Sequence, residues 1–191
     1  MDPMPLTFRP LALADLVLMH GWFAQAHVAE WYRDEAKLSY EGVVAKYAPR
    51  IQGHEPVRAF IIAYGNHPIG YIQVYMVRDY PDYRAYIDID DGTAGVDLFI
   101  GDPAYVNRGL GGPMLALFLR AIVFASADVT GSLIDPEVAN ARAIRSYEKV
   151  GYRHMTTIED RQNARPVHLM YLGKDDDAMI RRDGRPTGNA G

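Results

Sequence analysis

The chain has 191 residues and no cysteine, 49% of its residues are hydrophobic, and its formal net charge is −4 at pH 7. Without cysteine it can form no disulfide, no thiolate metal site and no cysteine nucleophile. The six histidines have no metal-ligand spacing, so no metal is expected. The mildly acidic charge argues against a nucleic-acid partner and is compatible with a cationic small molecule.

The ends of the chain suggest a single domain followed by a tail. The opening Met-Asp-Pro lacks the basic and apolar regions of a signal peptide, and no apolar run approaches the length of a membrane span. We therefore expect a soluble cytoplasmic protein with no membrane partner. Residues 1–174 are predicted to form one domain, and residues 175–191 are predicted to form a polar, glycine-rich, disordered tail.

The first part of the chain alternates between the apolar period of helices and the β-branched runs of strands. It predicts a strand at residues 6–13, a helix at residues 16–23 and a second helix that begins after Ser39, which is a good N-cap. A β-hairpin follows, with strands at residues 57–64 and 69–77.

Two segments of this region have more than one interpretation. Glu30, Trp31 and Tyr32 form either a loop whose tryptophan fills the core, or an aromatic and acidic wall of an acceptor site. Residues 78–92 are rich in aspartate and tyrosine. They form either a solvated loop with a short edge strand, or a negatively charged lip over a cleft, in which tyrosine rings supply flat apolar contacts.

A glycine-rich turn follows a buried strand at residues 95–101. Gly109 and Gly111 lack a Cβ atom, so their backbone N–H groups can approach an anion closely. The apolar helix that begins here, with a stripe from Met114 to Ala125, directs its positive end at the same point. The pattern fits a phosphate-binding turn, although a plain strand-to-helix connection has the same composition.

The last part of the chain predicts a strand at residues 131–134, a helix and a final antiparallel pair at residues 152–158 and 166–172. The helix begins after Asn140 and ends at Gly151, which are good N-cap and C-cap residues. Spacings of three and four place Asn140 and Tyr147 on one face of it.

The glycine turn and the helix after it resemble, in this order, the two acetyl-CoA motifs of the GCN5-related N-acetyltransferase (GNAT) superfamily. The first motif, Q/R-x-x-G-x-G/A, matches at Gly109 and Gly111. It departs at Val106, where the family has Gln or Arg, which removes a side-chain contact but no backbone donor. The second motif, N-x-x-A-x-x-x-Y-x-x-x-G-F/Y, matches at each specified position of residues 140–152.

This resemblance implies an α/β fold of the GNAT type. In that fold a mixed, mostly antiparallel central sheet, flanked by helices, splays between its fourth and fifth strands. Here those strands would be residues 95–101 and 131–135. The resemblance covers about residues 6–172.

The resemblance also implies acetyl-CoA as cosubstrate, with its pyrophosphate on the glycine turn and its pantetheine arm on exposed backbone of the fourth strand. Tyr147 would protonate the departing thiolate as general acid; without the motif, it could equally be a packing residue. The residues assigned to acetyl-CoA are Leu98, Phe99, Ile100, Arg108, Gly109, Leu110, Gly111, Gly112, Asn140 and Tyr147.

Two carboxylates are candidates for binding the acceptor amine. Asp97 interrupts an apolar strand, where a charge is costly unless it has a partner or a function, and Asp135 ends the next strand. Alternatively, Asp97 is a strand acid whose hydrogen bonds are satisfied within the fold, and Asp135 is a turn acid before Pro136. By alternation, Asp97 should face the side opposite to Val96 and Leu98.

The surrounding residues narrow the resemblance to aminoglycoside 6'-N-acetyltransferases. The similarity includes residues 95–97 and 135–136, the Glu-Trp-Tyr step at 30–32 and the Gly-Tyr-x-Gln strand at 70–73. It implies direct transfer of an acetyl group, in a ternary complex, to a cationic small amine, the 6'-amine of an antibiotic. Asp97 and Asp135 would hold its ammonium groups, and one of them would accept a proton.

Two other functions are compatible with the same motifs. One is an acyltransferase acting on the side-chain amine of hydroxylysine in siderophore assembly, and the other is a non-catalytic CoA-binding module. The chain would act as a monomer or a homodimer.

Overall fold

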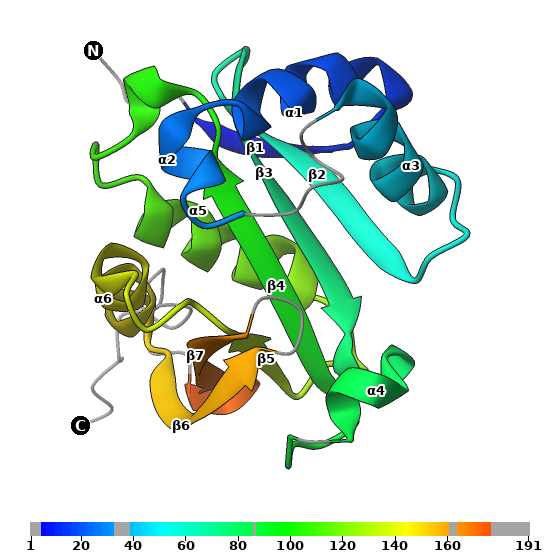
Figure 1. The fold of residues 1–191 in the computed structure, drawn as a ribbon. Coiled ribbons are helices and arrows are strands. Elements are labelled where there is room, and N and C mark those ends of the chain that lie inside the picture. Colours follow the sequence, from blue (N-terminus) through cyan, green and yellow to red (C-terminus); the bar gives the residue numbers. More distant parts are fainter. Residues whose placement is uncertain (1–4, 33–38, 86, 161–163, 177–191) are drawn as a thin grey trace, which may run out of the picture.

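The computed structural model describes residues 5–32, 39–85, 87–160 and 164–176. Seven strands form one sheet in the order β1-β2-β3-β4-β5-β7-β6 (Figure 1). Among the strands of the described residues, β4 and β5 alone pair in parallel, and the other pairs are antiparallel, as predicted. The strands are β1 (Leu6–Pro10), β2 (Val57–Tyr64), β3 (His67–Met76), β4 (Thr93–Ile100), β5 (Gly131–Ile134), β6 (Arg153–Asp160) and β7 (Arg165–Gly173).

The predicted helices form with the predicted caps. The Ser39 hydroxyl accepts a hydrogen bond from the backbone N–H of Gly42 at 3.0 Å, and the Asn140 side chain accepts one from Ala143 at 3.1 Å. Gly151 ends its helix at φ 118°, which favours glycine. The α-helices are α1 (Leu16–Phe23), α2 (Ala26–Ala29), α3 (Tyr40–Ile51), α4 (Pro81–Arg84), α5 (Gly111–Phe118) and α6 (Ala141–Val150).

Three local predictions were wrong. β1 ends at Pro10 instead of residue 13, because the chain turns into a short 3₁₀ helix at Leu13–Asp15, whose Asp15 binds Arg9 at 2.6 Å. The described part of residues 78–92 contains no strand; it forms α4 and a connection. The stripe predicted for α5 is rotated: Ala121 and Ala125 are exposed. After Phe118 the chain forms a π turn, whose extra residue rotates the positions that follow.

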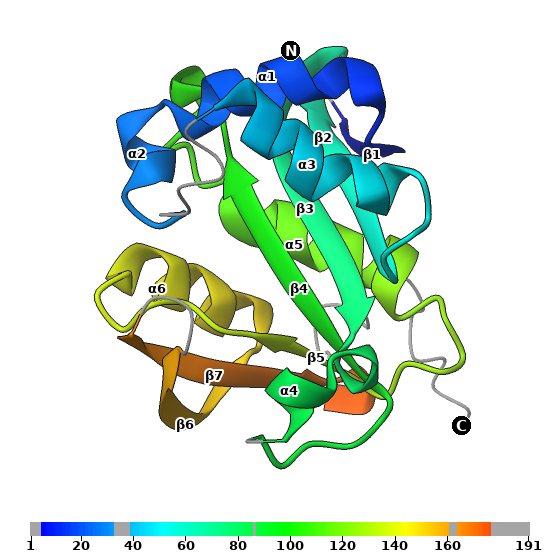
Figure 2. The ribbon, with the colours of Figure 1, turned by 45° about the vertical axis from the view of Figure 1, so that its right-hand side comes forward.

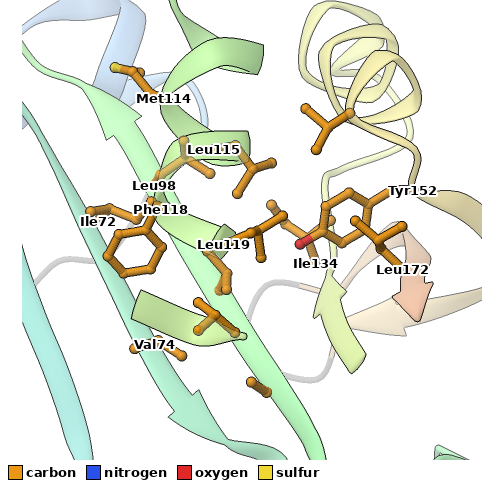
Figure 3. Packing of buried hydrophobic residues seen from close by; sticks show 14 of the residues in the cluster. Ile72, Val74, Leu98, Met114, Leu115, Phe118, Leu119, Ile134, Tyr152 and Leu172 are labelled. Carbon is orange, nitrogen blue, oxygen red and sulfur yellow. The ribbon is translucent and has the colours of Figure 1, made fainter. Parts of the chain in front are cut away.

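One face of the sheet packs against α5. Figure 3 shows Phe118 beside Ile72 and Leu98, with Leu119 between these strand residues and Tyr152. All five side chains are buried, and Ile72, Phe118 and Leu119 are fully enclosed. The Tyr152 hydroxyl is satisfied inside the core by a 2.6 Å hydrogen bond to Ser132 of β5. This core therefore ties α5 to both halves of the sheet.

The opposite face carries a second, aromatic core under α1 and α3. Phe99 of β4 lies 5.6 Å from the ring of Tyr71 and 5.3 Å from that of Phe23. Tyr47 of α3 stacks on Phe23 at 5.9 Å. As predicted by alternation, Leu98 belongs to the α5 core while its neighbours in β4 face this second side.

The sheet splays between its two parallel strands, as predicted. β4 and β5 pair only where Thr93–Gly95 meets Gly131–Leu133, and beyond this point they diverge (Figure 2). Residues 96–100 keep their pairing with β3 alone. One side of their backbone is therefore available to other partners.

Among the described residues, no helix is both long and apolar enough to cross a membrane. Of the predicted tail, residues 177–191 lie outside the described part of the chain.

Candidate active site

A cavity of about 1550 Å³ lies where β4 and β5 diverge. It extends from the glycine turn at residues 109–112 to Asp97 and Asp135, and Tyr147 lines it between them. The structure thus brings the two sequence motifs and the two candidate carboxylates to one site. Figure 2 shows the elements around it: α2 near the end of β4, with α6 and α4 beside the lower strands.

The glycine turn has the backbone geometry expected of an anion cradle. Asn107 and Gly109 adopt left-handed conformations, with φ of 62° and 74°, and a Cβ at Gly109 would meet no atom within 4 Å. A Cβ at Gly111 would instead come within 3.1 Å of the Ser146 hydroxyl. Gly109 therefore permits the turn, whereas Gly111 permits close packing of α5 on α6.

Arg108 does not line the cavity, although it belongs to the predicted cofactor set. Its side chain is exposed, and its guanidinium lies 5.8 Å from the centre of the Tyr105 ring. Of the predicted turn residues, Gly109, Leu110, Gly111 and Gly112 line the cavity.

Three basic residues on α6 line the cavity beside this turn, and sequence reasoning missed them. Arg142, Arg145 and Lys149 are separated by three and four positions and so share one helix face. Arg142 donates a 3.0 Å hydrogen bond to the Asn107 side chain, which ties α6 to the turn. In the sequence, the signal that could have revealed these basic residues was their spacing of three and four positions inside the second motif.

The backbone of β4 faces the cavity at alternate residues. The Tyr32 hydroxyl donates to the Leu98 carbonyl at 2.7 Å, and His27 Nε2 lies 3.0 Å from the Ile100 carbonyl. A carbonyl only accepts, so this nitrogen carries the proton. Gly101 donates to Ile69 of β3, and alternation therefore turns the backbone of Phe99 toward β3 as well. Leu98 and Ile100 are the residues that present backbone to the cavity.

The predicted aromatic and acidic wall is only partly present. Trp31 and Tyr32 line the cavity, but Glu30 does not. Glu30 is exposed and lines a smaller hollow of about 240 Å³ shared with Trp31 and Asn140. The Trp31 indole N–H is buried and has no hydrogen-bond partner among the described residues. Trp22, not Trp31, is the tryptophan that fills the core.

Residues from the acidic segment form one rim of the cavity, which agrees with the lip interpretation. Asp79 and Tyr80 line the cavity, as do Asp82 and Tyr83 of α4. The Tyr83 hydroxyl donates a 3.1 Å hydrogen bond to Asp135. α4 itself has no buried residue, so it is attached to the molecule as a surface element.

The carboxyl of Asp135 titrates near neutrality. Burial, and secondarily the nearby charge of Asp97, raise its pKa to about 7, while the hydrogen bond from Tyr83 opposes this shift. Such a carboxyl can both bind a cation and take up a proton at physiological pH.

The Tyr147 phenol keeps its proton at neutral pH. Burial, together with the charges of Asp97 and Asp135, raises its pKa above the ordinary value. Its ring lies 6.2 Å from that of Tyr152, and its hydroxyl makes no hydrogen bond with any described residue. Its protonated phenol thus belongs to the lining of the cavity.

A family model described as an acetyltransferase (GNAT) domain matches residues 12–160. This chain belongs to the GNAT acetyltransferase family. Among curated proteins, aminoglycoside N(6')-acetyltransferase type 1 of Klebsiella pneumoniae is 29% identical over 154 residues, which are 80% of this chain and 76% of that protein.

Solved structures of this family superpose closely. Aminoglycoside acetyltransferase AAC(6')-Ib in complex with ribostamycin and coenzyme A has a TM-score of 0.83 at 27% identity, covering 94% of this chain and 99% of that one. The complex of the same enzyme with coenzyme A and kanamycin has a TM-score of 0.79 at 28% identity, covering 90% and 96%.

The raised pKa of Asp135 has a consequence for stability. Its stabilising contribution is complete below the unfolded pKa of 3.8 and is lost as the pH rises through about 7. We expect Asp135→Asn to increase the free energy of unfolding by up to about 4 kcal/mol at pH 9 and by little at pH 4, since the pKa rises from 3.8 to about 7 and one pKa unit corresponds to about 1.4 kcal/mol.

Chemical denaturation at both pH values measures this difference. Asp82→Asn, which removes an exposed carboxyl from the same cavity rim, is the matched control and should change stability little at either pH. An equal effect of Asp135→Asn at pH 4 and pH 9 would contradict the assignment.

Proposed function

We propose that this protein transfers an acetyl group from acetyl-CoA to an amine of an aminoglycoside, the 6'-amine, by direct transfer in a ternary complex. The observation that carries the proposal is one cavity that is lined by the glycine turn and the basic residues of α6, by the carboxylates Asp97 and Asp135, and by Tyr147. The relatives named above support the choice of acceptor. An anionic cosubstrate and a cationic acceptor are the pair of ligands that such a charge distribution favours.

The basic end fits the phosphates of acetyl-CoA. The first N–H groups of α5 and the left-handed turn at Gly109 would receive the pyrophosphate. Arg142, Arg145 and Lys149 supply counter-charge along α6. The cavity-facing backbone of Leu98 and Ile100 would hold the pantetheine arm, so that the activated acetyl group is presented near Asp97.

The acidic end fits the acceptor. Asp97 and Asp135 would hold its ammonium groups, and the tyrosines of the rim would contact its sugar rings. With a pKa near 7, Asp135 would accept the first proton that leaves the ammonium nitrogen. That nitrogen then bonds to the acetyl carbon as the carbon–sulfur bond breaks.

Tyr147 would complete the proton balance. Its phenol gives a proton to the departing sulfur, and the second proton lost by the acceptor nitrogen restores the phenol. No covalent acyl-enzyme is required, because both reactants are held side by side in one cavity.

The role of the turn can be tested with two substitutions of equal shape. Asn and Asp both tolerate the left-handed conformation of Gly109, so Gly109→Asn and Gly109→Asp differ mainly in charge. By Coulomb repulsion we expect acetyl-CoA affinity to be about tenfold weaker in the aspartate variant than in the asparagine variant. Calorimetry at low and high salt measures the difference. Equal affinities of the two variants would show that the phosphates do not bind at this turn.

Tyr147→Phe should leave acetyl-CoA affinity and stability unchanged while lowering kcat about 10²-fold, the low end for a positioned general acid. Tyr64→Phe makes the same change at a half-buried tyrosine outside the cavity and should retain full activity. Steady-state release of free thiol is the measurement. A Tyr147→Phe enzyme with wild-type kcat would make this tyrosine a packing residue.

The acceptor can be tested with kanamycin and ribostamycin as substrates. Asp97→Asn and Asp135→Asn should each lower kcat/KM about 10- to 150-fold, since a hydrogen bond to a charged group is worth about 1.5–3 kcal/mol. Asp128→Asn, an exposed acid away from the cavity, should not. Added salt should raise the wild-type KM.

Other outcomes of this screen select the other functions. Turnover of hydroxylysine without turnover of aminoglycosides would identify a siderophore-type acyltransferase. Binding of acetyl-CoA without transfer to any amine would identify a CoA-binding module.

A further inference from the structure

A buried amide contacts Asp97 from the side of the sheet opposite to α5. Gln73 of β3 is 8% exposed, and its register partner in β4 is Asp97. Its Nε2 donates a 2.6 Å hydrogen bond to Asp97 Oδ2, while its Oε1 accepts from Tyr71 at 2.6 Å and from Arg50 at 2.7 Å. An arginine can only donate, so the orientation of the amide is fixed, and its N–H must point at the carboxylate.

Arg50 belongs to α3, the helix that covers this face, and two further contacts hold its guanidinium in place. Its Nε donates to Glu55 at 3.0 Å, and its guanidinium lies 5.0 Å from the centre of the Tyr47 ring of α3. Glu55 balances the charge of Arg50, and the guanidinium remains directed at Gln73. The chain Glu55–Arg50–Gln73–Asp97 therefore runs from the end of α3 into the cavity.

Such a chain needs a reason, because the surrounding core is aromatic and apolar. Buried polar groups reduce stability unless all of them are satisfied. Hydrophobic residues at all three positions, Arg50, Tyr71 and Gln73, would remove this requirement. The hydrogen bonds from Tyr71 and Arg50 instead converge on the Gln73 oxygen, which leaves the Gln73 N–H directed at one cavity-lining carboxylate.

Resting on the function proposed above, we propose that Gln73, oriented by Arg50 and Tyr71, is a positioning residue that holds the Asp97 carboxylate in place for the acceptor amine. Asp135 has a different kind of side-chain partner, the phenol of Tyr83 from the surface element α4. Asp97 is thus the rigidly held acid of the pair.

A double-mutant cycle tests whether Gln73 acts through Asp97. Gln73→Met keeps the side-chain length and removes both polar groups. It should lower kcat/KM for kanamycin about 10-fold or more, with acetyl-CoA affinity unchanged. In an Asp97→Asn background the same change should cost less than about twofold, because the carboxylate that it positions is gone. Equal losses in both backgrounds would overturn the proposal.

Tyr71→Phe is the matched control for the buried network. It removes one of the two hydrogen bonds to the Gln73 oxygen and leaves the contact with Asp97 intact. We expect a smaller loss of kcat/KM than in Gln73→Met at a similar loss of thermal stability. Losses that follow stability alone, in both variants, would contradict the positioning role.

A second measurement needs neither turnover nor a folded Gln73 variant. In the wild type with ¹⁵N-labelled glutamine, the Gln73 side-chain amide is identified by its proximity to the Tyr71 ring. One of its protons should be shifted downfield and protected from exchange. It should move upfield in Asp97→Asn, a weaker acceptor, and remain in place in Asp82→Asn.

If the chemical shift of the Gln73 side-chain amide does not change in Asp97→Asn, the proposed contact is overturned. If the wild type acetylates no aminoglycoside, the proposed function fails, while the spectroscopic test of Gln73 still gives its own answer.

Discussion

The site depends on how briefly β4 and β5 remain paired. Three residue pairs join them, from Thr93–Gly95 to Gly131–Leu133, and the two halves of the sheet then separate. α5 packs across this junction, and the Tyr152–Ser132 hydrogen bond lies in the same core. A strand that loses its neighbour exposes unpaired backbone, which is costly when buried without partners. Here that backbone becomes part of a binding site, and Tyr32 and His27 satisfy two of its carbonyls.

The basic residues of α6 and the acidic residues that line the same cavity come from different elements. Arg142, Arg145 and Lys149 project from α6. Asp97 belongs to β4, Asp135 follows β5, and Asp79 and Asp82 belong to the segment before β4. Tyr147 lies on α6 but its pKa responds to both Asp97 and Asp135. In the proposed reaction, the thioester and the amine would meet beside Tyr147, between the basic residues of α6 and the two carboxylates.

The sequence was sufficient to predict the motif-bearing elements and their order, because caps, glycine turns and apolar periods are local signals. Ser39, Asn140 and Gly151 mark their helix ends in the structure as they do in the sequence. Orientation was harder to predict. Arg108 turns away toward Tyr105, and Glu30 faces a separate hollow. Gln73 was noticed only as part of a strand, since its contact with Asp97 depends on sheet register, which local patterns do not encode.

The exposed position of α4 affects how the acceptor side of this enzyme can evolve. No residue of the helix is buried, yet its side chains reach the acidic end of the cavity and contact Asp135. Except at Tyr83, which packs against the core cluster of Val77, Ile87 and Leu133, substitutions in α4 can therefore alter the acceptor side without removing a core contact. Selection can vary the range of amines through this short rim, while the strands and α6 conserve the chemistry of transfer.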